Sequence, residues 1–251
     1  MDPTIFLYVL VGFIAQVIDG ALGMAYGVSS NSFLLSLGLP PAAASASVHM
    51  AEVVTTGISG YSHWRLGNVD WKLVRRLLFT GVVGGATGAY LLTSIDGDLL
   101  KPYIAAYLLI IGVVIILKAF KMKQNQELDE NHSPRISLLG LFGGFCDAIG
   151  GGGWGPVVTS TLVARGKHPR MTIGSVNFSE FFVTLVQSIV FVLTLSISQY
   201  WQIIVGLLVG GAIAAPFAAR MTKKLPLKTL MIMVGLLIII LSIRTIVLAM
   251  R

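Results

Sequence analysis

The strongest constraint on the fold is a repeat inside the chain. Residues 12–52 align with residues 140–180 at a constant offset of 128, without a gap. Matches between glycines and leucines are expected by chance in an apolar chain, but recurring acidic residues and prolines are not. The sequence therefore predicts two copies of one structural unit. The matched pairs include Asp19 with Asp147, Gly23 with Gly151, Gly27 with Gly155, Pro41 with Pro169, Ser47 with Ser175 and Glu52 with Glu180.

Long stretches without acidic or basic residues predict that both copies lie in a membrane. Residues 20–51 and 181–219 contain no Asp, Glu, Lys or Arg, and each stretch is long enough for two passes of about 20 residues. Only 12% of the chain is charged, against about 25% in soluble domains. We therefore expect an all-α polytopic protein of the cell (plasma) inner membrane.

Each copy is expected to begin with a helical hairpin that glycines interrupt, followed by three transmembrane helices. The leading segments, 4–38 and 136–165, are too long for one pass and contain GALGMAYG and AIGGGGWGP. The expected spans are 42–63, 74–94, 99–119, 171–195, 200–219 and 226–248. The predicted organisation is a first repeat over 1–120, a polar cytoplasmic linker over 121–135 and a second repeat over 136–251.

The distribution of Lys and Arg predicts the orientation of the two copies. If each leading hairpin returns to its starting side, fifteen of the 18 basic residues share one side, and only Lys101, Arg244 and Arg251 lie opposite. A single crossing by each leading segment would divide them ten to eight. Because cytoplasmic loops are rich in Lys and Arg, the first arrangement is favoured. It makes the second copy inverted relative to the first, with both termini outside and the basic loops and linker cytoplasmic.

The glycine-rich breaks are the predicted anion-binding elements. A helix that breaks inside the membrane leaves backbone N–H groups without intrahelical partners, and these groups can bind an anion in the absence of a basic side chain. Close packing of helices through small residues is the alternative interpretation. The candidate binding residues at the breaks are Gly23, Gly27, Ser29, Gly151, Gly152, Gly153 and Gly155.

The segments SVHMAE (47–52) and SVNFSE (175–180) add a polar stripe to the helix after each hairpin. Within them Ser47, His49, Ser175 and Asn177 are candidate hydrogen-bond donors to an oxyanion. The alternative for His49 is a buried histidine whose ring nitrogens are satisfied inside the protein.

Four acidic residues lie in otherwise uncharged stretches and are candidates for proton coupling. They are Asp19, Glu52, Asp147 and Glu180. A buried carboxyl group is costly unless it carries a proton or has a partner. In the alternative interpretation these groups are structural and accept backbone N–H bonds at the helix breaks.

Several other functions are not supported by the sequence. The chain has no GxSxG, no HExxH and no Cys/His set with metal-ligand spacing, so no enzyme, metal or cofactor is predicted. The single cysteine, Cys146, lies in an apolar run that favours packing. Despite a pI near 9.7, the basic residues form short clusters between apolar segments, as in loops that face lipid, so no nucleic-acid partner is expected. His63, Trp64 and Arg65 fit an interfacial aromatic belt.

The motifs together resemble the TauE/SafE family, the sulfite exporter family, over nearly the whole chain. They are IDGALGMAYGVSS (18–30), LGLPPAAASASVHMAEV (37–53), HWRLGNVDW (63–71), CDAIGGGGWGPVV (146–158) and GSVNFSEF (174–181). The resemblance implies a secondary transporter that exports small sulfur-containing anions such as sulfite or organosulfonates. The expected partners are this anion and the lipid bilayer, and a homodimer is left open. The alternative function is a cation- or proton-conducting channel that uses the intramembrane carboxylates.

Overall fold

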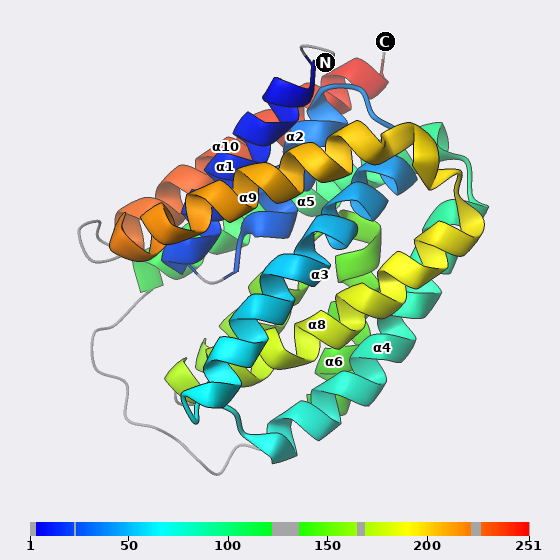
Figure 1. Cartoon of the computed structure of the whole chain (residues 1–251). Helices are drawn as coiled ribbons and strands as arrows, with labels where there is room; N and C mark the ends of the chain where they lie inside the picture. Colours follow the sequence, from blue (N-terminus) through cyan, green and yellow to red (C-terminus); the bar gives the residue numbers. More distant parts are fainter. Residues whose placement is uncertain (1–3, 23, 122–135, 165–168, 222–226, 251) are drawn as a thin grey trace.

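A computed structural model of the chain describes residues 4–22, 24–121, 136–164, 169–221 and 227–250, and within these ranges the chain is helical and has no strand (Figure 1). Five of the described helices are long and apolar enough to cross a membrane. Two shorter apolar helices, Thr4–Asp19 and Ile136–Gly150, begin the first and the second half. By length and composition, the candidate membrane spans are Trp71–Ser94, Gly97–Phe120, Met171–Thr194, Ile197–Ala214 and Met231–Ala249.

The long helices begin and end within three residues of the predicted spans. One of them, α3 (Pro41–Arg65), is too polar to be recognised as a span by hydropathy alone. Its 25 residues nevertheless extend about 37 Å, more than the hydrocarbon thickness of a bilayer. The others are α4 (Trp71–Ser94), α5 (Gly97–Lys121), α8 (Pro169–Thr194), α9 (Trp201–Met221) and α10 (Leu227–Ala249), with the short η2 (Ile197–Tyr200) before α9.

Each leading segment consists of two helical pieces that meet at a break. The first contains α1 (Thr4–Leu22) and α2 (Tyr26–Ser36). The second contains α6 (Ile136–Gly150), one π-helical turn η1 (Gly155–Thr159) and α7 (Ser160–Ala164). At the second break Gly151 and Gly152 have φ angles of 62° and 147°, which L residues rarely adopt. The chain reverses direction there. Gly143 of α6 consequently lies against Val158 of η1, where a Cβ atom on Gly143 would meet the Val158 side chain.

Helices of the two halves pair with each other. α1 lies along α9, and α6 lies along α4, while α3 pairs with α8 and α5 pairs with α10 (Figure 1). Glycines permit two of these close crossings: a Cβ atom on Gly84 would meet the carbonyl of Leu141, and one on Gly210 would meet the carbonyl of Val9. Each half therefore buries its leading helix against the other half.

Equivalent side chains fix the second piece of each hairpin. Tyr26 Oη donates to the Leu207 carbonyl at 3.0 Å, and Trp154 Nε1 donates to the Val176 carbonyl at 3.2 Å. Arg244 of α10 donates to the carbonyl of Ser36, the last residue of α2. These contacts hold the two breaks at the centre of the molecule.

Candidate functional site

A cavity of about 340 Å³ lies where the two helix breaks meet. Its lining comes from both breaks and from α3 and α8. Along α3 it extends from Glu52 to His63, which is about 16 Å at the helical rise per residue. The described lining residues include all four candidate carboxyl groups, Asp19, Glu52, Asp147 and Glu180, and no Lys or Arg.

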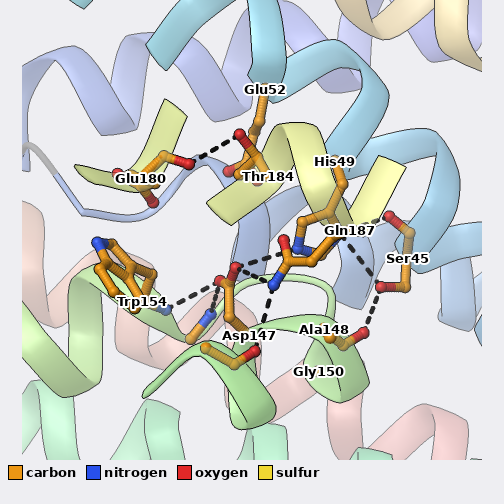
Figure 2. Close-up of polar contacts among 12 residues, drawn as sticks. Ser45, His49, Glu52, Asp147, Ala148, Gly150, Trp154, Glu180, Thr184 and Gln187 are labelled. Carbon is orange, nitrogen blue, oxygen red and sulfur yellow. Dashed lines mark hydrogen bonds and ion pairs between the residues drawn. The ribbon is translucent and has the colours of Figure 1, made fainter. Parts of the chain in front are cut away.

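Asp147 is held by four hydrogen-bond donors from three different elements (Figure 2). Its Oδ1 accepts from the backbone N–H groups of Gly153 and Trp154 at 2.7 and 2.9 Å. Its Oδ2 lies 3.0 Å from Gln187 Nε2 and 3.1 Å from His49 Nε2. The Gln187 Nε2 atom also donates to the Gly144 carbonyl at 3.2 Å, which fixes the amide orientation because a carbonyl only accepts. Both carboxylate oxygens are thus fully occupied.

His49 connects α3 to the second break. Its Nδ1 lies 2.7 Å from the Ser45 carbonyl, so Nδ1 carries a hydrogen. Its Nε2 lies 3.1 Å from Asp147 Oδ2, the one contact at ion-pair distance between described residues, and this contact is ionic when the imidazole carries both hydrogens. Ser45 Oγ adds a bond of 2.5 Å to the Ala148 carbonyl. His49 is fully buried and does not line the cavity.

Asp19 caps the first break in the same way but lacks the side-chain partners. Its Oδ1 accepts from the N–H groups of Ala25 and Tyr26 at 2.8 and 3.1 Å. No described residue donates to its Oδ2. At the offset of 128, His49 corresponds to Asn177 (177 − 49 = 128) and Gln187 corresponds to Ser59 (187 − 59 = 128). These two residues bind each other instead, Asn177 Nδ2 to Ser59 Oγ at 3.0 Å, and both line the cavity.

The two glutamates lie on facing helices, Glu52 on α3 and Glu180 on α8, and both line the cavity (Figure 2). Glu52 is buried, and its Oε2 has no hydrogen-bond partner in the described part of the chain. Neither glutamate forms an ion pair with a described residue. The site therefore contains three carboxyl groups, including Asp19, without a cationic partner among the described residues.

The two helix breaks touch through glycine. A Cβ atom on Gly27 would lie 2.7 Å from Gly152 Cα and 2.9 Å from Glu52 Oε1. Any larger residue would separate the breaks or displace the carboxyl group. Of the other predicted glycines, Gly153 and Gly155 also line the cavity.

Several predicted binding residues lie away from the cavity. Gly151 faces the Asn31 side chain, whose Nδ2 donates to the Gly150 carbonyl at 2.6 Å. Ser29 is buried in α2. Ser47 and Ser175 donate to backbone carbonyls one turn earlier, each at 2.7 Å. Gly23 lies outside the described residues.

Polar residues that the sequence analysis missed continue the stripe on α3 and α8, and two of them, Thr56 and Ser59, line the cavity. Thr56 and Thr184 are equivalent, since 184 − 56 = 128, and each donates to the carbonyl of its glutamate, Glu52 or Glu180. Ser59 and Gln187 follow in the same register. Extending the alignment past residue 52 at the unchanged offset would have found both pairs.

Comparisons with known proteins agree over most of the chain. A family model described as sulfite exporter TauE/SafE matches residues 8–245. The chain is 42% identical over 247 residues to the probable membrane transporter protein YtnM of Bacillus subtilis (strain 168), covering 96% of this chain and 82% of that protein. It is 27% identical over 161 residues to the probable membrane transporter protein YdhB of the same organism, covering 62% of this chain and 66% of that protein. No solved structure matches.

Proposed function

Because this chain belongs to the sulfite exporter TauE/SafE family of membrane transporters, we propose that it exports a small sulfur-containing anion, such as sulfite or an organosulfonate. The observation that carries the proposal is the cavity between the two helix breaks. Transporters built from inverted repeats bind their substrates at such breaks near the bilayer midplane.

We infer that the two halves are inverted repeats. The pairing of α1 with α9 and of α6 with α4 is what a two-fold relation between the halves would produce, since each leading helix contacts the same element of the other half. In the orientation that the positive-inside rule predicts, the connection after α3 is cytoplasmic. The cavity reaches toward that end of α3, at His63, so this conformation would be open to the cytoplasm.

Anion binding in an acidic cavity requires proton uptake. The N–H groups of residues 25, 26, 153 and 154 are already bound by the two aspartates. The remaining donors include Asn177 and Ser59, and Glu52 and Glu180 would each supply one more if protonated. An anion would then bind only together with a proton, because ionised glutamates repel it. We assign coupling to Glu52 and Glu180, and a positioning role to Asp147 and His49.

The test is flux in liposomes that contain the purified protein. Labelled sulfite flux is measured with and without a proton gradient, with thiosulfate, sulfate and sulfoacetate as competitors. Wild type should show saturable flux that competitors reduce, and Glu180→Gln or Glu52→Gln should abolish its dependence on the gradient. Asp98→Asn is the matched control, because Asp98 is an exposed carboxyl group at the start of α5. Gradient dependence that survives in both glutamate variants would refute the coupling assignment.

The acidic lining also supports a second candidate, a cation- or proton-conducting channel. Four carboxyl groups line the cavity, and no described Lys or Arg does. A channel would show no flux of any of these anions and a cation leak that disappears when a glutamate is replaced. That result would replace the transporter proposal.

A further inference from the structure

An apolar groove of about 350 Å³ lies between α3, α4 and α8, apart from the polar cavity. Gly57 and Gly60 of α3 form its floor, where α3 lies so close to α8 that a Cβ atom on Gly57 would be 3.2 Å from the Phe181 ring. Tyr61 and Trp64 form one wall, and Trp71 of α4 with Phe178 of α8 forms the other. From Gly57 to Trp64 the groove runs about 10 Å along α3.

Ring contacts fix the shape of the groove. Tyr61 and Trp64 meet edge to face with centroids 5.8 Å apart, and Trp71 and Phe178 do so at 5.2 Å. The groove continues past Phe178 to Phe182, whose rings are 5.6 Å apart. Tyr61, Trp64 and Trp71 remain about half exposed, at 55%, 48% and 46%. Rigid aromatic walls around a glycine floor give a preformed channel for a flexible apolar chain.

A cluster of basic residues lies at the end of the groove that contains Trp64 and Trp71. Its members are Arg65, Lys72, Arg75 and Arg76, all exposed and none in an ion pair with a described residue. Arg75 follows Trp71 by one helical turn and therefore shares its face of α4. The acidic residue in this stretch, Asp70, accepts the N–H groups of Lys72 and Leu73 as the cap of α4.

We propose that this groove binds an anionic phospholipid, with one acyl chain between the aromatic walls and the phosphate against the basic cluster. The apolar groove matches the chain, and the adjacent positive charge matches the headgroup. A lipid is the occupant that carries both features in one molecule and reaches the site from within the bilayer. The site is independent of the transported substrate.

The groove and the cavity lie on opposite faces of the α3–α8 contact. A Cβ atom on Gly60 would lie 3.1 Å from Phe178 Cα, so the helices cross closely there. Next to these residues, Ser59 and Asn177 face the cavity and bind each other at 3.0 Å. A bound lipid therefore contacts the same crossing that holds one wall of the cavity.

Tryptophan quenching by brominated lipids tests the site. Trp71 and Trp201 are the first residues of α4 and α9 and are similarly exposed, at 46% and 52%. Only Trp71 lines the groove. Variants that keep the fully buried Trp154 and either Trp71 or Trp201, with the other tryptophans replaced by Phe, are reconstituted in mixed bilayers of phosphatidylglycerol and phosphatidylcholine. In each sample one of the two lipids carries bromine atoms on its acyl chains, and the two samples are compared.

Brominated phosphatidylglycerol should quench Trp71 more strongly than brominated phosphatidylcholine does, whereas Trp201 should not distinguish them. Replacing the four basic residues by Gln should lower this preference by up to about fivefold for each charge at low salt. Gly57→Leu fills the groove and should lower it with the charges intact, in protein that stays monodisperse. The proposal is overturned if Trp71 shows no preference, if Trp201 shows the same preference, or if the preference survives either set of substitutions.

Discussion

The two aspartates at the helix breaks occupy equivalent positions but have different surroundings. Asp19 and Asp147 each accept two backbone N–H groups across the turn that follows them. Only Asp147 also binds His49 and Gln187, while Asn177 and Ser59, the equivalents of those residues, bind each other. The difference is one of side-chain length and chemistry on α3 and α8. The capped turn is the same at both breaks, and both aspartates line the cavity, but only at the second break do side chains of α3 and α8 also hold the aspartate.

The largest expected effect is on stability, from Asp147→Asn. The amide replaces one acceptor oxygen by a donor that faces other donors, and it removes the ion pair with buried His49. We expect a loss of about 3 kcal/mol or more in the free energy of unfolding, measured by denaturation in mixed micelles. Asp19→Asn should cost about 1 kcal/mol, because the amide oxygen can still accept the two backbone N–H groups that Asp19 binds. Equal losses for the two variants would remove the distinction between the halves.

The second comparison is between His49→Ala and Asn177→Ala. Removing His49 leaves Asp147 Oδ2 without its charged partner and creates a space in the fully buried core, which should cost about 2–4 kcal/mol. Asn177 lies on the cavity wall and loses one bond to Ser59, for about 1 kcal/mol or less. Asn177→Ala should instead reduce the affinity for the transported anion, measured as a raised KM for flux with little change in stability.

The helix bounds and the breaks could be predicted from the sequence, but the side-chain contacts that hold Asp147 at the second break could not. Apolar runs, the repeat and the glycines defined the helices, because these signals are local. The position of His49 beside Asp147 depends on how α3 lies against α6, which connects residues 98 positions apart. The polarity of α3 hid it from a hydropathy search, although its polar stripe indicated that one face lines a cavity.

The role of the helix breaks also depended on information absent from a one-dimensional pattern. The glycine runs predicted backbone N–H groups available to an anion. In the structure the aspartates that precede each break already bind two of these groups apiece. Capping by the aspartates was the alternative interpretation, and only the three-dimensional arrangement of the turn distinguishes a capped break from an open one.

Two substitutions would give the first half the side chains that hold the aspartate in the second. Ser59→Gln with Asn177→His would offer Asp19 the two side chains that hold Asp147, in a cavity that has room for them. The new bonds would stabilise this conformation relative to the other conformations of the transport cycle. If they do so by about 1.4 kcal/mol, flux should fall about tenfold and thermal stability should rise. Ser59→Gln combined with Asp19→Asn is the control, since the amide accepts fewer bonds. An unchanged flux would mean that transport does not require Asp19 to remain without side-chain hydrogen-bond partners.

The smallest expected effect concerns the aromatic residue after the first break. Tyr26→Phe removes only the hydroxyl that donates to the Leu207 carbonyl, and it should cost about 1 kcal/mol in unfolding free energy. Its equivalent, Trp154→Phe, also leaves a space beside Gly81 and Gly143, which the indole ring contacts. The Trp154 variant should therefore be the less stable of the two by thermal denaturation. The reverse order would mean that the indole ring of Trp154 contributes no packing beyond its hydrogen bond.

The pairing of α1 with α9 has a consequence for how the protein is made. The two helices begin at residues 4 and 201, so 197 residues separate them (201 − 4 = 197). At a synthesis rate of about 5–20 residues per second, α1 waits roughly 10–40 seconds in the membrane before its partner emerges from the ribosome. The helix α4 waits far less for α6, because only 65 residues separate their first residues (136 − 71 = 65). The second break can thus be assembled while the first still lacks its contact with α9. The helices inserted last therefore complete the part of the chain that is synthesised first.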